Sequence, residues 1–148
     1  MYSEEAKTIA VDFDGTIVEH RYPAIGPEMD FAFATLKALQ EKGHRLILWT
    51  IREGELLEEA VDFCRQHGVE FYAVNRNFPE EEYRHMEHRK LLADLFIDDR
   101  NVGGFPGWPA IWQMLHPEGG AFDHQLKNPE AHYNKSGKKR SLLKRLFG

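Results

Sequence analysis

The chain has 148 residues, of which 42% are hydrophobic and 12% aromatic, enough to build one hydrophobic core. No apolar run approaches the roughly 20 residues that span a bilayer, and the opening MYSEEAK lacks the basic and then apolar pattern of a secretory signal, so we expect a cytoplasmic protein. Cys64 is the single cysteine, which excludes an internal disulfide, and its apolar periodic surroundings predict a core position.

The formal net charge of −5 is unevenly distributed along the chain. Six of the 19 basic residues lie from Lys135 onward, where there are no acidic ones, so residues 1–134 carry 13 basic against 24 acidic side chains. An acidic body of this kind argues against broad nucleic-acid binding. From residue 119 the apolar density falls, which predicts a flexible basic tail over 119–148 behind a domain over 1–118. A contact of this tail with an anionic membrane or a partner chain stays open beside a simply solvated tail.

The predicted secondary structure begins with a buried strand. Residues 9–11, Ile-Ala-Val, form a short apolar run typical of strands that are buried on both faces of a parallel sheet. A helix is predicted next, from Pro27, a residue favoured at the first helical position, to Gly43, which can end a helix in a left-handed conformation. The apolar run over 46–49 predicts a second strand.

Helix and strand continue to alternate through the rest of the domain. The remaining predicted elements are a helix over 55–67 closed by Gly68, a strand over 69–74, a polar helix over 80–92, a strand over 95–97 and a short helix over 109–115. This alternation indicates an α/β fold, and we expect a three-layer α/β/α Rossmann-like sandwich around a central parallel sheet.

Acidic, hydroxyl and amide side chains stand directly after the predicted strands. In a parallel α/β sheet, ligands bind outside the carboxyl ends of the strands. Carboxylates that converge there repel one another, and a divalent cation removes that repulsion. The sequence therefore predicts a cation-dependent site built from these strand ends: Asp12 and Asp14, Thr50, Asn75, and Asp98 with Asp99.

The chemistry of these side chains favours phosphoryl transfer. Asp12 and Asp98 suit magnesium, which prefers oxygen ligands and takes only one or two carboxylates directly. Asp12 could attack a phosphorus atom held beside the metal, because an aspartate carboxylate is an established nucleophile for phosphoryl groups. Asp14 could protonate the leaving oxygen and later accept a proton from water. Gly15 permits the tight turn that follows.

Four motifs of one known family occur in order along the chain. The run Asp12-Phe13-Asp14-Gly15-Thr16 resembles the first motif of the haloacid dehalogenase (HAD) superfamily, which holds the nucleophile and the acid/base residue. Thr50 resembles the second motif, whose hydroxyl holds the phosphoryl oxygens, and Lys90 resembles the third, a cation that neutralises nucleophile and phosphate. Residues 96–99, Phe-Ile-Asp-Asp, resemble the fourth, the metal-binding carboxylate pair, and the resemblance covers residues 8–116.

This resemblance implies a magnesium-dependent phosphatase that hydrolyses a phosphate monoester through a phosphorylated aspartate. The implied partner is a phosphorylated small molecule or a phosphorylated macromolecule. His20 lies where the leaving group is expected, and Arg52 is placed either to hold a second anionic group or to form an ordinary surface ion pair. The candidate residues are Asp12, Asp14, Thr50 and Lys90 for catalysis, Asp12, Asp14, Asp98 and Asp99 for the metal, and Gly15, Thr16, His20, Arg52 and Asn75 for the substrate.

The chain leaves little room for a cap domain, and it offers two basic residues for the third motif. The intervals where members of the family insert a cap hold 33 residues (17–49) and 39 residues (51–89), barely enough for the predicted elements, so we expect no cap domain. An open site of this type implies either a large substrate or a neighbouring subunit that acts as a lid. A homo-oligomer is therefore one of the two alternatives. Arg89 competes with Lys90 for the third motif, and we favour Lys90 because a compact ammonium suits the neutralisation of a point charge.

Other classes of site account for the pattern less well. An EF-hand is excluded, because Thr16 and Ile17 stand where its loop needs a further acidic or amide ligand and a glycine. A response-regulator receiver domain carries its acidic pair on the first strand and its phosphorylated aspartate on the third, the reverse of the order found here. A receiver-like or degenerate phosphate-binding domain without turnover stays the alternative. A zinc site at His85 and His88 is less favoured than a solvated helix face.

Overall fold

The computed structural model of this chain describes residues 5–82 and 91–118. The chain divides into two compact units between Pro106 and Gly107, and the first of these units carries the sheet. The predicted boundary after residue 118 falls where the description ends, so it stays a prediction.

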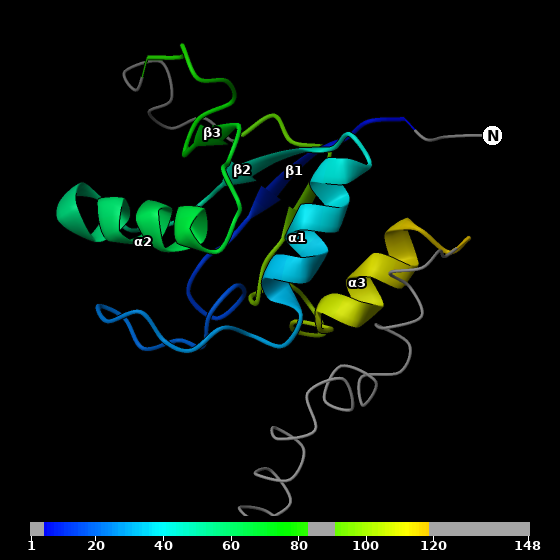
Figure 1. The fold of residues 1–148 in the computed structure, drawn as a ribbon, viewed down its shortest axis with the longest axis horizontal. Helices are drawn as coiled ribbons and strands as arrows, with labels where there is room; N and C mark the ends of the chain where they lie inside the picture. Colours follow the sequence, from blue (N-terminus) through cyan, green and yellow to red (C-terminus); the bar gives the residue numbers. More distant parts are fainter. Residues whose placement is uncertain (1–4, 83–90, 119–148) are drawn as a thin grey trace, which may run out of the picture. The chain divides into compact units, whose positions relative to one another are not determined.

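The first unit is built on one parallel sheet (Figure 1). Its strand order is β3-β2-β1-β4, and every pairing in it is parallel. The predicted α/β class with a parallel sheet is thereby confirmed, and the architecture is consistent with a Rossmann-like sandwich. The strands are β1 (Thr8–Val11), β2 (Arg45–Leu48), β3 (Ala73–Val74) and β4 (Leu95–Ile97).

The strand order creates a switch point beside β1. The chain passes from β1 to β2 and then to β3 in one direction, and β4 pairs on the opposite edge of β1. Val11 is in register with Leu48 on one side and with Ile97 on the other, so the three strands end at the same level. In open α/β sheets, ligands bind at such a switch point.

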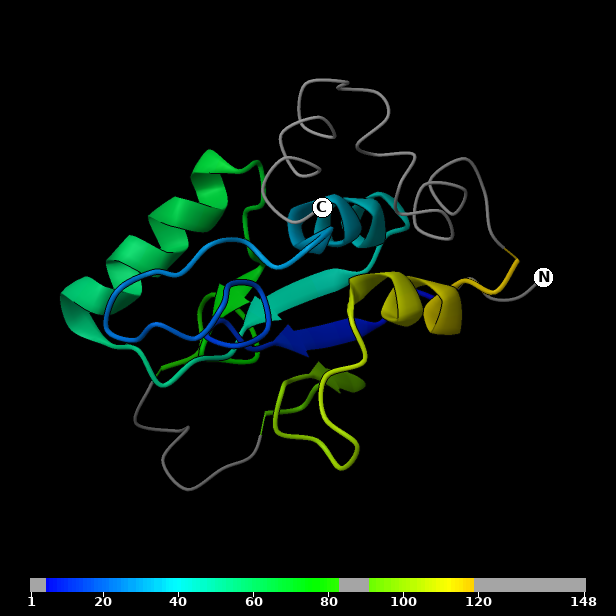
Figure 2. The ribbon, with the colours of Figure 1, turned by 90° about the horizontal axis from the view of Figure 1, so that it is seen from below.

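Two helices of the first unit follow β1 and β2: α1 (Ala32–Glu41) and α2 (Gly54–Gln66). Figure 2 shows both on the same face of the sheet, as two right-handed crossovers in the same direction require. On the strands themselves, Ala10, Ile47 and Ala73 form a buried cluster with Leu91. Successive strand residues alternate between the two faces, and the flanking residues of β1 and β2 are also fully buried, so both faces of the sheet are covered.

The helix predicted from Pro27 begins five residues later, at Ala32, so this start was wrong. The carbonyl of Pro27 accepts a hydrogen bond from the amide of Glu19 at 2.8 Å, and Glu28 forms an antiparallel bridge with Val18. Residues 27–28 are thus paired with the loop after β1 and cannot take part in a helix. The Glu28 carboxylate instead accepts a hydrogen bond from the amide of Phe33, in the first turn of α1, at 3.1 Å.

The structure agrees with some of the other predicted elements and differs from the rest. Gly43 and Gly68 follow α1 and α2 with φ of 92° and 88°, the left-handed conformation that was expected of them. The strand predicted over 69–74 is limited to its last two residues. Of the helix predicted over 80–92, residues 83–90 lie outside the described chain, and the described flanks are not helical.

The second unit contains α3 (Trp108–Leu115), which matches the predicted short helix over 109–115. Among the helices that the structure describes, none combines the length and the apolar character needed to cross a bilayer. Cys64 is buried within α2 as predicted, and desolvation raises the pKa of its thiol to about 12, so the thiol stays protonated and inert.

Candidate functional site

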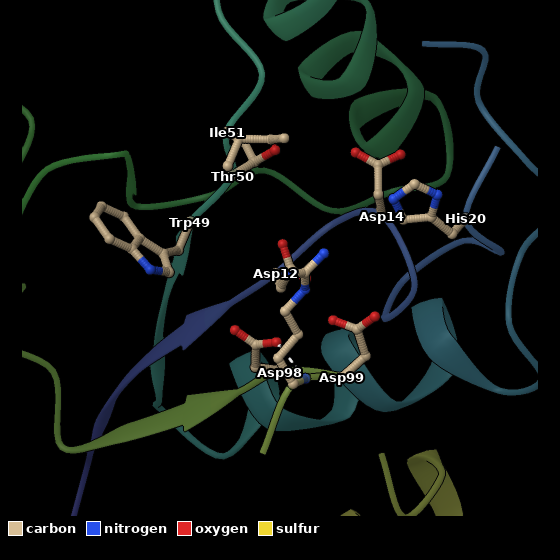
Figure 3. Close-up of a pocket in the computed structure, with 9 residues that line it drawn as sticks. Asp12, Asp14, His20, Trp49, Thr50, Ile51, Asp98 and Asp99 are labelled. Carbon is tan, nitrogen blue, oxygen red and sulfur yellow. Dashed lines mark hydrogen bonds between the residues drawn. The ribbon is translucent and has the colours of Figure 1, made fainter. Parts of the chain in front are cut away.

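Three carboxylates meet at the switch point: Asp12 after β1, and Asp98 with Asp99 after β4. The pairing of β1 with β4 brings them together, and the amide of Asp12 donates to the carbonyl of Ile97 at 3.0 Å. One carboxylate oxygen from each of the three aspartates lies within 4.8 Å of the others. These residues, which we call the acidic triad, could therefore hold a metal ion (Figure 3).

Electrostatics within the triad are unfavourable to three negative charges. The pKa of Asp12 is raised from an ordinary value of 3.8 to about 7, and burial is the largest cause. The charges of Asp98 and Asp99 and a hydrogen bond with Asp99 contribute to this rise, and the backbone hydrogen bond of Phe13 opposes it. A bound cation would offset both causes, because it stabilises the ionised carboxylates that desolvation and repulsion disfavour.

Gly15 allows this close approach. Its φ of 85° is left-handed, and its amide donates to the carbonyl of Val18 at 2.7 Å in the tight turn that the sequence predicts. A Cβ atom at this position would overlap Oδ2 of Asp99 and would lie 2.9 Å from Asp99 Cγ. The missing side chain therefore leaves room for one carboxylate of the triad.

The triad forms part of a pocket of about 430 Å³ at the carboxyl ends of β1, β2 and β4 (Figure 3). Six of the predicted site residues line it together: Asp12, Asp14, His20, Thr50, Asp98 and Asp99. They come from three separate strand ends and from the loop after β1, so the fold brings together residues up to 87 positions apart, Asp12 to Asp99.

Asp14 is not part of the metal-binding group, although the sequence placed it among the metal ligands. Its carboxylate faces Arg52: Arg52 Nε donates to Asp14 Oδ2 at 2.8 Å, and Arg52 Nη2 donates to Asp14 Oδ1 at 2.8 Å. The two oxygens of Asp14 are thus held in a bidentate contact, which fixes the plane of the carboxylate.

Arg52 also differs from its predicted surroundings. The sequence suggested a ligand for a second anionic group or a surface ion pair, but the side chain of Arg52 is fully buried and is not among the residues that line the pocket. The hydrogen bond with Asp14 is the largest cause that raises the pKa of the guanidinium, so Arg52 stays charged. A substrate anion would have to displace Asp14 to reach it.

Three further candidates support the pocket in different ways. The amide of Thr50 donates to Asn75 Oδ1 at 2.8 Å, so Asn75, which has a left-handed φ of 54°, holds the end of β2 in place without lining the pocket itself. The hydroxyl of Thr50 accepts a hydrogen bond from the amide of Arg52 at 3.1 Å. Thr16 is buried and lies 3.5 Å from Asp12 Oδ2, at the outer limit of a hydrogen bond.

Lys90 lies outside the described residues, as do Arg89, His85 and His88. The assignment of the third motif and the zinc alternative therefore stay predictions.

Three residues that line the pocket were missed by sequence reasoning: Trp49, Ile51 and Arg100. Each is the immediate chain neighbour of a predicted site residue, which is the signal that could have found them. Ile51 is 81% exposed, so it offers apolar surface at the edge of the pocket. Arg100 is exposed, and its amide donates to Asp98 Oδ1 at 2.7 Å.

Comparison with known proteins gives one informative match. No protein-family model and no curated protein matches the chain. A solved structure, described as that of a conserved protein from Bacteroides thetaiotaomicron, is similar to it with 60% sequence identity and a TM-score of 0.71. The match covers 80% of this chain and 97% of that one. The chain therefore belongs to the same protein family as this conserved Bacteroides protein.

Proposed function

We propose that the protein is a magnesium-dependent phosphatase of the HAD type, which hydrolyses a phosphate monoester through a phosphorylated Asp12. The observation that carries this proposal is the composition of one pocket. Residues that resemble the first, second and fourth motifs of that superfamily line it together: Asp12, Asp14, Thr50, Asp98 and Asp99.

The donor set of the triad fits magnesium. The ion prefers oxygen ligands, accepts one or two carboxylates directly and keeps waters or phosphate oxygens in its other positions. Asp12 and Asp98 would hold it, with Asp99 beside them, and the ion would favour the ionised form of Asp12, which burial and the neighbouring carboxylates disfavour. When bound, the ion would neutralise charge on the phosphate oxygens and orient them.

Asp12 and Asp14 divide the reaction into two steps. In the first, a carboxylate oxygen of Asp12 bonds to phosphorus while the ester bond breaks, and Asp14 gives a proton to the leaving oxygen. In the second, Asp14 takes a proton from a water molecule that attacks phosphorus, which releases inorganic phosphate and restores Asp12. Both carboxylates line the same pocket, as this sequence of steps requires.

Thr50 would hold the phosphoryl group in both steps. Its hydroxyl oxygen already accepts the amide hydrogen of Arg52, so the hydroxyl proton is left to point toward a phosphoryl oxygen. Lys90, as the residue that resembles the third motif, would add a positive charge beside Asp12 and the phosphate.

The substrate class follows from the walls of the pocket. Trp49 and Ile51 offer apolar surface, while His20 and Arg100 offer polar contacts to the part of the substrate beyond the phosphate. We propose a phosphorylated small molecule or a phosphorylated group on a macromolecule, in a site with no cap domain. A second copy of the chain as a lid is part of the same proposal.

Phosphate release from a panel of phosphate monoesters by the full chain tests this function. We expect magnesium-dependent turnover that EDTA abolishes and that Asp12→Asn removes, with Asp62→Asn, an exposed carboxylate on α2, as the matched control. Binding of phosphate esters without any turnover would instead support the phosphate-binding alternative. Turnover that survives removal of magnesium would contradict the proposal.

A further inference from the structure

The charged side chain of Arg52 has no exposed surface, and its guanidinium donates four hydrogen bonds. Two of them are the contacts to the oxygens of Asp14. The other two reach backbone carbonyls: Nη1 donates to Pro23 at 3.1 Å and Nη2 donates to Ala24 at 2.9 Å. A guanidinium has five N–H donors, so nearly all of them are used here.

Those two carbonyls belong to the loop over residues 19–27, which we call the 19–27 loop. Its ends are joined by the hydrogen bond from the amide of Glu19 to the carbonyl of Pro27 at 2.8 Å. A Cβ atom at Gly26 would overlap the carbonyl oxygen of Glu19 and would lie 2.9 Å from Arg21 Cγ, so the loop is folded tightly on itself. The loop also carries His20, which lines the pocket.

Aromatic rings complete the surroundings of Arg52. Its guanidinium carbon lies 5.1 Å from the ring centroid of Phe13 and 5.1 Å from that of Tyr22. Phe13 is next to Asp14 in the chain, and Tyr22 belongs to the 19–27 loop. The guanidinium therefore contacts the strand end through the ring of Phe13 and the loop through the ring of Tyr22, in addition to its hydrogen bonds.

Burial of a charged pair is a poor way to gain stability. The cost of desolvation can exceed the attraction between the charges, and apolar residues of similar volume often stabilise a fold as well or better. What an Arg–carboxylate pair does offer is a fixed geometry, because two parallel hydrogen bonds set both position and orientation. The arrangement around Arg52 is thus best explained by the orientation that it gives to Asp14 and to the loop.

We propose that Arg52 is a positioning residue that couples Asp14 to the 19–27 loop, so that the proton-transferring carboxylate and the His20 side of the pocket are assembled together. This inference rests on the proposed role of Asp14 in phosphoryl transfer. Figure 3 shows the carboxylate of Asp14 apart from those of the acidic triad, and both Asp14 and His20 line the pocket.

The bidentate contact has a consequence for proton transfer. Both oxygens of Asp14 accept N–H groups of Arg52, and this contact fixes the plane of a carboxylate that lines the pocket. Each of these oxygens keeps a second lone pair, and the contact with Arg52 sets the direction in which that lone pair can exchange a proton with a leaving oxygen or with water. Weakening the pair should therefore change the dependence of the rate on the leaving group.

A first experiment tests the coupling without any assay of turnover. Trypsin can cleave after Arg21, whose side chain is 62% exposed in the 19–27 loop. We expect cleavage there to be at least about tenfold faster in Arg52→Lys than in wild type, because the shorter side chain cannot hold Asp14 and both carbonyls at once. Asp14→Asn should also speed this cleavage. Arg65→Lys should not, because Arg65 belongs to an exposed ion pair with Asp62 on α2.

The second experiment asks whether Arg52 acts through Asp14. With an alkyl phosphate ester, the single-turnover rate at which Asp12 is phosphorylated should fall roughly tenfold to a hundredfold in Arg52→Lys, whereas with p-nitrophenyl phosphate, whose leaving group needs no proton, this first step should slow much less. In an Asp14→Asn background the same Arg52 substitution should cost almost nothing further, because the group that it positions is gone. A purely structural role would instead slow the phosphorylation of Asp12 alike with both esters and would act additively with Asp14→Asn.

The outcomes separate this inference from the proposed function. Unchanged cleavage at Arg21 in both Arg52→Lys and Asp14→Asn would overturn the coupling, whatever the activity. If Arg52→Lys does not fold, judged by its thermal transition, cleavage of Asp14→Asn decides alone. Absence of phosphatase activity in wild type with faster cleavage in both variants would defeat the proposed function but leave the coupling of Asp14 to the loop in place.

Discussion

Asp12 and Asp14 stand two residues apart, yet their electrostatic surroundings are opposite. Asp14 is satisfied within the chain, because Arg52 neutralises it and occupies both of its oxygens. Asp12 faces Asp98 and Asp99, and its pKa is raised to about 7 by burial and by those two charges. One aspartate of the run is thus neutralised by a buried arginine, whereas the other lies among carboxylates, where a bound cation would stabilise its ionised form.

The largest effect that separates the two regions is expected from Asp14. Replacement by Asn leaves the triad intact but removes proton transfer, which contributes about 10² to 10⁴ in rate with an alkyl leaving group. Rapid-quench kinetics with alkyl and p-nitrophenyl esters would measure it. Equal losses in the rate of Asp12 phosphorylation with both esters would place Asp14 in folding or metal binding instead of in proton transfer.

Gly15 leaves room for Asp99, so a side chain at this position should disturb the acidic triad. Gly15→Ala should weaken magnesium binding and lower stability, because its Cβ would strike Asp99 and its φ is left-handed. Gly43→Ala is the matched control, with a φ of 92° against 85° and no atom within 4 Å of the added Cβ. Both variants should lose about 1–2 kcal/mol to the backbone conformation, so calorimetric titration with magnesium isolates the clash. Equal magnesium affinity in the two variants would contradict this function of Gly15.

The pH dependence of stability tests the raised pKa of Asp12 directly. A carboxyl whose pKa is higher in the folded protein stabilises it below the ordinary pKa, and this contribution is lost as the pH rises through the folded value. In EDTA, Tm should therefore fall between pH 3.8 and about 7, and it should fall less in Asp12→Asn. Magnesium should restore Tm of wild type above about pH 7, where Asp12 is ionised. Parallel pH profiles of Tm for the two proteins would show that Asp12 is not the group responsible.

The smallest effect is expected at the mouth of the pocket. Arg100 is exposed and lines the pocket, so Arg100→Gln should raise KM for an ester with a second anionic group roughly fivefold and leave kcat unchanged. The rise corresponds to a loss of about 1 kcal/mol in binding free energy. Arg65→Gln, on α2, is the control. A fall in kcat with KM unchanged would place Arg100 at the transferred phosphate instead.

Sequence reasoning succeeded where a residue's position follows from a short local pattern. Apolar runs mark buried strands, and the polar residue after each run must lie at the carboxyl edge of the sheet, so Asp12, Thr50 and Asp98 could be placed in one pocket without coordinates. It failed where the deciding contact is distant in sequence. The pairing of Asp14 with Arg52 joins residues 38 positions apart, and no local pattern distinguishes a buried arginine from a substrate ligand.

The helix start predicted in the loop after β1 was wrong for a related reason. Pro27 has the local preference of a helix start, but its carbonyl is used by Glu19, and this tertiary contact overrides the preference. The apolar pocket residues Trp49 and Ile51 were overlooked because an apolar residue at a strand end is usually part of the core. Exposure of Ile51 is a property of the folded chain that composition does not reveal.

The central claim is that Asp12 is the nucleophile of a metal-dependent phosphatase, and chemical trapping of the intermediate tests it most directly. Acid quenching during turnover, followed by borohydride reduction, converts a phosphorylated aspartate to homoserine, which peptide mapping can locate. With p-nitrophenyl phosphate as the substrate, we expect the modification at position 12 in wild type with magnesium, its accumulation in Asp14→Asn, and its absence in Asp12→Asn. Turnover without any modification at position 12, or with modification at another aspartate, would contradict the account.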